Sequence, residues 1–376
     1  MEKKLAIIGA NEAITMLIEK AKKLGYETHV FAWQCGDPGE KIADYFYPIS
    51  ISEKEKILDI CKKIGICGIC SITSDFAAPT VSYVARNLCL PCNPEITDIV
   101  ARNKYEMRLA FKKAGLYCPK FIQVTEEISE NMVSDFNFPV IVKPTDRWSS
   151  KGITRVDKYS DLNDAIKYAI SESFNKKAIV EEFMSGPEFS AECIVINGNV
   201  NILTITQKMT TGYPHYIETG HIQPAEIDAS IIGNIKNQII NAVKALSIYN
   251  SAAHVEFRII DDQNIGLMEI GARMGGDCIG TDLTPLSTGY DFIKMVIDVS
   301  VGNEVSFEKS NHLKKVAISF IINEKDYNEY LFMKNNNRLI KYSIYDTDFD
   351  KNVVDSSSRH GYYIYEVWLE GKWEKL

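Results

Sequence analysis

The chain has 376 residues, more than one ordinary hydrophobic core accommodates, which predicts two or three domains. A hydrophobic fraction of 45% and a charged fraction of 24% are typical of a globular protein, and the net charge of -8 argues against a surface for nucleic acid or anionic membranes. No apolar run approaches the roughly 20 residues that span a bilayer, and the opening MEKKLAIIGAN lacks the features of a signal peptide. We therefore expect a cytoplasmic protein whose partners are neither nucleic acids nor membranes.

Nine cysteines without a secretion signal indicate reduced thiols rather than a disulfide framework. Cys67, Cys70, Cys89 and Cys92 have the spacing of a four-thiolate zinc site. The first two, however, lie in ICGICSIT, which reads as a buried strand, where residues three apart face opposite sides. Cysteine also serves as a small core hydrophobe, so the core interpretation is favoured over zinc.

Strand-like and helix-like segments alternate over residues 1–102. The apolar runs KLAIIGA, THVFAW, DYFYPI and GICGICSI are separated by helical patterns, one ending at Gly25 and the others around residues 53–64 and 75–88. This alternation predicts a doubly wound parallel sheet. The first turn, Gly9-Ala10-Asn11, lacks the three glycines of a dinucleotide-binding fingerprint, so a dinucleotide site is not expected.

The pattern changes at about residue 103. Helices are expected at 103–114, 161–173, 231–246 and about 290–301. Strand-like runs are FIQVT, FPVIVKPT, GITRV and AIVEEFM, followed by antiparallel strands over 187–207 and 252–270. KVAISFII, RLIKYSIY and GYYIYEVWLE, within residues 312–376, suggest a small α+β module. The predicted fold class is therefore α/β plus α+β.

Two carboxylates carry the strongest chemical signal. Glu256 in AHVEFR and Glu269 in LMEIGARMGGD lie on apolar strands that a turn from Asp261 to Asn264 would join as a hairpin. Glutamates in such surroundings are rarely buried without a cation. Arg273 follows in a glycine-rich turn, where the backbone can approach a ligand closely. Two carboxylates, one arginine and flexible glycines indicate a metal-assisted phosphate site.

Other segments fit the same kind of ligand. Lys143 ends a β-branched strand, and the loop after it, DRWSSKGIT, offers hydroxyls and backbone N–H groups suited to phosphate oxygens. Taken alone, that loop reads as an ordinary polar turn. The hinge EEFMSGPE offers backbone groups to an adenine edge, and a carboxylate after it can accept the ribose hydroxyls.

The order of these elements resembles the ATP-grasp superfamily over about residues 1–300. The hinge is similar to that of D-alanine–D-alanine ligases, whereas EIGARMGGD resembles L-amino-acid ligases and the carbamoyl-phosphate-synthase-like branch. HYIETGH resembles the E-x-G-H element beside the acyl substrate of amino-acid ligases. The resemblance implies a Rossmann-like domain at 1–102, an ATP-grasp domain at 103–305 with a lid at about 116–182, and a C-terminal module at 306–376.

The resemblance also implies roles for individual residues. ATP would be bound by Lys104 and Lys143 at the phosphates, Ser150 and Gly152 in the closing loop, Glu181, Glu182, Phe183 and Met184 at adenine, and Glu188 at ribose. Glu256 and Glu269 would hold one or two Mg²⁺ ions, with Mn²⁺ as a substitute. His254, two positions before Glu256 in the sequence, is expected either to pack against its neighbours or to support the metal carboxylate. Arg273, Glu218 and His221 would act on the substrates, His221 as a proton acceptor.

Two positions depart from the family pattern. Gly271 stands where many ATP-grasp enzymes have a metal-binding Asn, and Trp148 stands where a glycine is common in the phosphate loop. These departures leave the number of metal ions open. Ser74 and Asp75 are expected to line a cleft in the N-terminal domain.

The implied activity is an ATP-dependent carboxylate–amine ligase that forms an amide through an acyl phosphate, plausibly between amino acids. A bicarbonate- or carbamate-phosphorylating enzyme and a non-catalytic ATP-binding protein are the alternatives. The expected partners are a small carboxylate and an amine. A homodimer is left open, since ATP-grasp relatives are often dimers.

Overall fold

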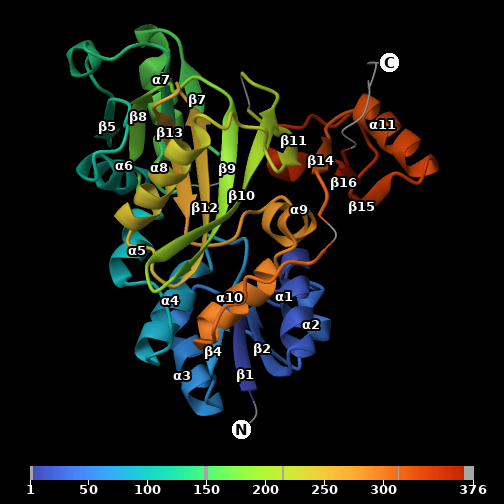
Figure 1. Ribbon diagram of the computed structural model, residues 1–376. Coiled ribbons are helices and arrows are strands. Elements are labelled where there is room, and N and C mark those ends of the chain that lie inside the picture. Colours follow the sequence, from blue (N-terminus) through green and yellow to red (C-terminus); the bar gives the residue numbers. More distant parts are fainter. Residues whose placement is uncertain (1–2, 148–150, 214–215, 312, 368–376) are drawn as a thin grey trace.

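The computed structural model describes residues 3–147, 151–213, 216–311 and 313–367. Within these ranges the strands form three sheets, one four-stranded and parallel, one four-stranded and antiparallel, and one eight-stranded and antiparallel. Figure 1 shows the parallel sheet near the N-terminus, with the other two sheets on the opposite side of the molecule. The predicted α/β plus α+β class is confirmed.

The N-terminal sheet has the order β3-β2-β1-β4. Its strands are β1 (Lys3–Ile8), β2 (Tyr26–Ala32), β3 (Tyr45–Pro48) and β4 (Gly68–Cys70). The connecting helices are α1 (Glu12–Lys23), α2 (Gly39–Ile42), α3 (Lys54–Ile64), α4 (Ala78–Asn87) and α5 (Glu95–Val100). The loops after β1 and β4 lie at the carboxyl end of this parallel sheet, the edge at which open α/β sheets bind ligands.

One face of the N-terminal sheet is covered by a helix from much later in the chain. Helix α10 (Phe292–Val301) packs against β4 and α1, as Figure 1 shows. Phe292 and Ile297 join Leu5 and Ile7 in one buried core. Gly68 on β4 allows this close approach, because a Cβ there would lie 2.4 Å from Val301.

The four-stranded antiparallel sheet, here called the lid sheet, has the order β5-β8-β6-β7. Its strands are β5 (Phe121–Val124), β6 (Val140–Pro144), β7 (Thr154–Val156) and β8 (Ala178–Glu182). Helix α7 (Leu162–Glu172) packs on this sheet and buries Leu162 and Ile166 against Val140 and Val180. Helix α6 (Lys104–Lys113) precedes the lid sheet and begins at Asn103, whose side chain caps it.

The eight-stranded sheet, here called the central sheet, has the order β13-β12-β9-β10-β11-β14-β16-β15. Its strands are β9 (Glu188–Ile196), β10 (Asn199–Thr210), β11 (Glu218–Gln223), β12 (Ser251–Ile259), β13 (Ile265–Gly271), β14 (Val316–Ile321), β15 (Leu339–Ile344) and β16 (Gly361–Glu366). The associated helices are α8 (Ile232–Ala245), α9 (Thr284–Thr288) and α11 (Glu324–Asn335).

The central sheet has one apolar and one polar face. Alternate residues of β9 and β12, such as Ala191, Val255 and Phe257, pack against α8 in a buried core. The residues between them, which include Glu192 and Glu256, face the other side. This alternation places a row of charged side chains on a rigid support.

The elements that the sequence did not predict include α2, α9, α11 and β11. Helix α2 is a single short turn, β11 lies in a segment rich in Gly, Pro and Tyr, and α11 buries only Tyr330 and Met333 among its residues. The turn at Asp261 was predicted correctly, since its carboxylate accepts the backbone N–H groups of Gln263 and Asn264. Strands β14, β15 and β16 continue the central sheet, and the domain boundaries themselves remain predictions.

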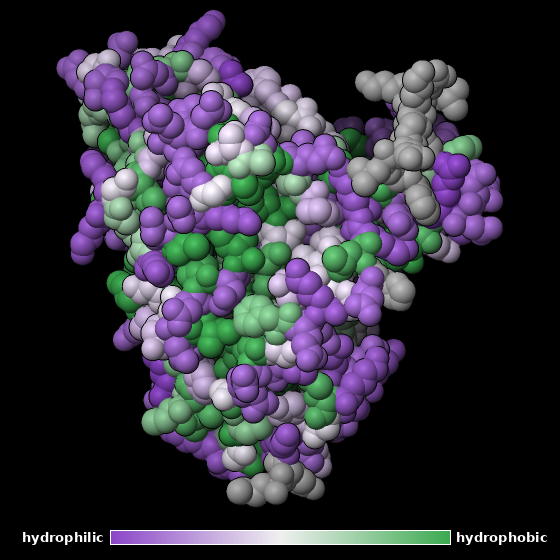
Figure 2. Space-filling view, viewed as in Figure 1, coloured by the Kyte–Doolittle hydropathy of each residue, from purple (hydrophilic) through white to green (hydrophobic). Residues whose placement is uncertain are grey.

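The described part of the chain contains no helix with the length and apolar character needed to cross a membrane. Figure 2 shows hydrophilic residues over most of one face, with apolar residues gathered across its middle, near α10.

Candidate functional site

The main cleft lies between the lid sheet and the polar face of the central sheet. Lysines and hinge residues line it from the lid side, and glutamates line it from the central sheet. Most of the residues predicted for nucleotide and metal binding meet here: Lys104, Lys143, Glu181, Glu182, Phe183, Met184, Glu188, Glu256 and Glu269.

Glu256 and Glu269 are direct cross-strand partners on β12 and β13. A bulge at Met268 makes this possible, because Phe257 pairs with Leu267 while Glu256 pairs with Glu269. The extra residue lets Leu267 enter the core and still turns Glu269 toward the cleft. The predicted pair of carboxylates is therefore brought together.

Two lysines offset the negative charge of these two carboxylates. Lys208 Nζ lies 2.5 Å from Glu256 Oε1, and Lys104 Nζ lies 3.0 Å from Glu269 Oε1. Like charges directly opposite on a sheet destabilise it unless cations offset them. The carboxylate oxygens thus form a donor set that suits a divalent cation. In this structure the ammonium groups of Lys104 and Lys208 supply the positive charge beside them.

The donor set is small. Among the described residues, no cluster of three or more His, Cys, Asp or Glu side chains is arranged to hold a metal ion. Glu256 and Glu269 therefore fit a hard ion such as Mg²⁺ whose remaining ligands are phosphate oxygens and water, which is its common mode of binding beside nucleotides.

Lys208 connects several carboxylates and was missed by the sequence analysis. Besides Glu256, its ammonium lies 3.5 Å from Glu188 and 3.8 Å from Glu218. Burial disfavours the charge, but these carboxylates outweigh burial and raise the pKa of Lys208. A lysine within the apolar strand NILTITQKMT was the available signal.

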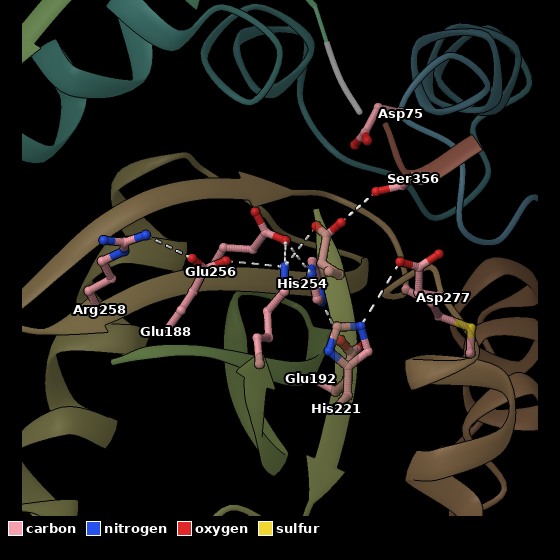
Figure 3. A network of polar contacts seen from close by, with 12 residues as sticks. Asp75, Glu188, Glu192, His221, His254, Glu256, Arg258, Asp277 and Ser356 are labelled. Atoms are coloured by element: carbon pink, nitrogen blue, oxygen red, sulfur yellow. Dashed lines mark hydrogen bonds and ion pairs between the residues drawn. The ribbon is translucent and has the colours of Figure 1, made fainter. Parts of the chain in front are cut away.

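A second bulge orients the predicted substrate residues. Lys208 pairs with His221 and Thr210 pairs with Glu218, which leaves Thr219 as the extra residue of β11. Glu218 and His221 consequently share the face that carries Lys208, although an uninterrupted strand would place residues three apart on opposite faces. Figure 3 shows Glu188, Glu256 and His221 in this network.

His221 is completely buried, and neither ring nitrogen has a hydrogen-bond partner among the described residues. The nearest carboxylate, that of Asp277, lies 4.0 Å from Nε2, beyond hydrogen-bond distance. Burial lowers the pKa of His221, which keeps the imidazole neutral and leaves one nitrogen able to accept a proton. Glu218 accepts a hydrogen bond from Ser356, a residue of the C-terminal segment.

Arg273 is held by Asp75 from the N-terminal region. Its Nε and Nη2 atoms lie 3.0 and 2.7 Å from the two carboxylate oxygens, a bidentate pair. Burial opposes the charge, but Asp75 outweighs it and raises the pKa of Arg273. The predicted catalytic arginine and the predicted cleft residue Asp75 are thus in direct contact.

The structure corrects the expected role of the Glu181 carboxylate. Arg108 donates to both of its oxygens, and Lys143 Nζ lies 2.5 Å from Oε1. Burial favours the neutral acid, but Arg108 and then Lys143 outweigh it and lower the pKa of Glu181 to about 2. A carboxylate used in this way positions Lys143 and is not free for an adenine amino group.

The Glu182 side chain also turns away from a nucleotide role. Its carboxylate accepts bonds from the backbone and side-chain N–H groups of Asn137 and from the backbone of Lys120. The backbone of the hinge remains near the cleft through Phe183 and Met184, both of which line it. The hinge therefore faces the cleft through Phe183 and Met184, whereas the carboxylates of Glu181 and Glu182 are engaged elsewhere.

Arginine side chains surround the rest of the hinge. Arg258 lies over the Phe183 ring, with its guanidinium carbon 5.1 Å from the ring centroid, and donates to the Met184 carbonyl. The same guanidinium contacts Glu188 at 3.1 Å. Glu188 lines the cleft as predicted for a ribose ligand, with Arg258 fixing its orientation.

The phosphate loop is described in part. Ser150 and Trp148 lie outside the described residues. Gly152 has a φ of +74°, and a Cβ there would lie 2.7 Å from Pro144. A glycine is therefore required where this loop returns to the lid sheet.

Two other predictions concern His254, which lines the cleft, and the four cysteines of the N-terminal region. His254 contacts Glu256 through Nε2 at 3.3 Å and binds Glu192 through Nδ1, as a residue supporting a metal ligand would. Cys67, Cys70, Cys89 and Cys92 are free thiols. Burial raises the pKa of Cys70 to about 12, which opposes the thiolate that zinc requires.

Residues 136–282 match the sequence model of the ATP-grasp domain. The chain contains an ATP-grasp domain. It is 27% identical over 295 residues to alanine–anticapsin ligase of Bacillus subtilis (strain 168), a match that covers 69% of this chain and 62% of that protein. D-alanine–D-alanine ligase of Acetivibrio thermocellus is 27% identical over 178 residues, which cover 43% of this chain and 46% of that protein.

Solved structures share the fold over nearly the whole chain. L-amino acid ligase from Bacillus licheniformis has a TM-score of 0.80 at 23% identity, covering 97% of this chain and 93% of that one. The ADP complex of N5-carboxyaminoimidazole synthetase from Staphylococcus aureus has a TM-score of 0.77 at 18% identity, covering 98% and 94%. The chain spans about three fifths of the length of the first curated relatives, so their activities are considered only as proposals.

Proposed function

We propose that this ATP-grasp protein is an ADP-forming carboxylate–amine ligase that acts on amino acids. The observation that carries the proposal is the position of Glu256 and Arg273, which line both the main cleft and a second cavity beside it. A phosphoryl group held at that junction would face a carboxylate held in the second cavity.

The residues of the main cleft fit a nucleotide triphosphate. Lys104 and Lys143 supply positive charge for the phosphates, the hinge backbone and Phe183 suit adenine, and Glu188 suits ribose. Glu256 and Glu269 would hold Mg²⁺, or Mn²⁺ in its place. When bound, the ion neutralises charge that develops on the phosphates.

The chemistry of a ligase follows from these positions. A carboxylate is a poor electrophile, but its oxygen can attack the γ-phosphorus of ATP, which releases ADP and forms an acyl phosphate. An amine then attacks the acyl carbon, Arg273 stabilises the oxyanion, and phosphate leaves as the amide forms. The neutral imidazole of His221 would accept the proton that the amine loses.

The choice of amino acids as substrates rests on the cavity and on the relatives. The second cavity encloses about 550 Å³, far more than a bicarbonate ion occupies. The curated relatives include alanine–anticapsin and D-alanine–D-alanine ligases, whose names describe the joining of amino acids. The fold is shared with N5-carboxyaminoimidazole synthetase as well, so a bicarbonate-phosphorylating activity is the second candidate.

Phosphate release from ATP and Mg²⁺ tests the proposal. The assay would compare pairs of the common L- and D-amino acids with bicarbonate and with no addition, and mass spectrometry would identify the product. Release that depends on an amino-acid pair and yields an amide is the expected result. Release with bicarbonate alone would support the second candidate, and no release under any condition would contradict both.

We also propose that the chain divides into domains at 1–102, 103–305 and 306–376, and that it forms a homodimer. Analytical ultracentrifugation and limited proteolysis would test them directly.

A further inference from the structure

The second cavity extends from the catalytic junction toward the start of α1. Its inner wall is shared with the main cleft through Glu218, His254, Glu256 and Arg273. Its far wall combines α1, the turn after β13 and strands β14 to β16. A substrate whose carboxylate lies at the junction would therefore direct its remaining atoms toward this far wall.

The cavity wall carries more carboxylates than cations. Each of its lysines and arginines is already paired, namely Lys208 with Glu256, Arg273 with Asp75, Lys341 with Asp282 and Arg359 with Asp277. Glu12, at the start of α1, has no ion-pair partner in the described part of the chain. The wall thus offers a free carboxylate and no free cation.

Aromatic rings surround the same end of the cavity. Phe320, Tyr345 and Tyr362 line it, and the guanidinium of Arg359 lies 3.7 Å from the Phe320 ring centroid. Glu12 and Tyr345 both line this cavity, and burial and then the Glu12 carboxylate raise the pKa of Tyr345 to about 12. Aromatic faces together with a carboxylate recognise ammonium and guanidinium groups.

The cavity also contains a buried acceptor without a donor. His221 is fully buried, lines this cavity, and has no hydrogen-bond partner for either ring nitrogen among the described residues. A buried polar atom left unpaired destabilises the fold. An N–H group of a ligand would satisfy the acceptor nitrogen.

We propose that one of the two substrates is an amino acid with an amine or guanidine side chain, held by Glu12 among the rings of Tyr345 and Tyr362. The inference rests on the proposed ligase function and adds the class of side chain. An α-ammonium group bound at Glu218 would not by itself require the carboxylate and rings at the far wall. The charge of the side chain is therefore the property to test.

Matched substrates separate charge from shape. Arginine and citrulline differ at one terminal group of the side chain, as do lysine and norleucine. With each as one member of a substrate pair, kcat/KM should be higher for the cationic member by up to about fivefold, the upper value expected for one exposed ion pair. Equal or lower kcat/KM for the cationic members would overturn the inference while leaving the ligase function intact.

Substitutions of Glu12 test whether this residue recognises the cationic side chain. Glu12→Gln should reduce the ratio of kcat/KM between arginine and citrulline by up to about fivefold, and Glu12→Lys should invert it. Glu19→Gln, at an exposed position on the same helix, is the matched control and should keep the wild-type ratio. An unchanged ratio in both Glu12 variants would contradict the assignment.

Direct binding decides the inference even if no amino acid supports turnover. Calorimetric titration of the full chain with arginine or citrulline, in the presence of ADP and Mg²⁺, should show tighter binding of arginine, by up to about fivefold. Equal binding of both, or of neither, would exclude a cation-selective cavity. Absence of turnover with retained arginine binding would instead contradict only the ligase proposal.

Discussion

Glu256 and Glu269 lie directly opposite each other on adjacent strands, and each carboxylate contacts a different lysine. Lys104 reaches Glu269 from the helix before the lid sheet, whereas Lys208 reaches Glu256 from within the central sheet. The pair therefore connects the two halves of the cleft electrostatically.

Glu269→Gln should lower the turnover of ATP by at least about 100-fold, because metal-assisted stabilisation of the transferring phosphoryl group is worth several kcal/mol. The variant should also lose the increase in melting temperature that Mg²⁺ and nucleotide give the wild type. Glu182→Gln, whose carboxylate faces Asn137, is the control. Near-normal turnover in Glu269→Gln would exclude Glu269 as a metal ligand.

Lys208→Met should destabilise the fold, since it removes the cation from a buried group of carboxylates. Breaking a buried ion pair typically costs about 3–5 kcal/mol. The urea midpoint should fall accordingly, and the exposed Lys236→Met should leave it unchanged. A midpoint equal to that of the wild type would show that the carboxylates do not depend on Lys208.

Arg273→Ala should reduce kcat by about 100- to 1000-fold while nucleotide affinity is largely kept, the usual result of removing one stabiliser of an oxyanion. Asp75→Asn should reduce kcat by about tenfold, because the bidentate contact that orients Arg273 is lost. Steady-state kinetics with ATP as the varied substrate would measure both. A large rise in KM for ATP at constant kcat would contradict these roles.

The pH dependence of stability should report on Glu181. Its pKa of about 2 in the folded chain lies below the ordinary value of 4.5. The stabilisation is therefore present above about pH 4.5 and is lost as the pH falls toward 2. Urea unfolding between pH 2 and 5 should show a shallower dependence in Glu181→Gln than in the wild type or Glu19→Gln.

Much of the fold was accessible from the sequence because the signals are local. Strands with apolar alternation, such as β12 and β13, and helices with a clear apolar stripe were predicted near their observed bounds. Helix α11 was missed because it is mostly polar and lies against the sheet through few side chains. Strand β11 was missed because its polar sequence is stabilised by its neighbours on both sides.

Site residues could be predicted from the sequence only where they belong to a local motif. The paired glutamates follow from their surroundings in the sequence, but the partner of Arg273 lies 198 positions away and no local pattern identifies it. The same holds for Arg108, whose contact with Glu181 changed the interpretation of that carboxylate. The bulges at Met268 and Thr219 decide which side chains share a face, and they depend on strand pairing.

Helix α10 has a consequence for how the chain is made. Strand β1 needs residues 292–301 to complete the core on its sheet, so Leu5 and Ile7 stay partly uncovered until α10 has been synthesised. A nascent fragment that ends before α10 would present a bare apolar surface suited to chaperone capture. The N-terminal sheet and α10 thus acquire their native packing together, as one cooperative unit.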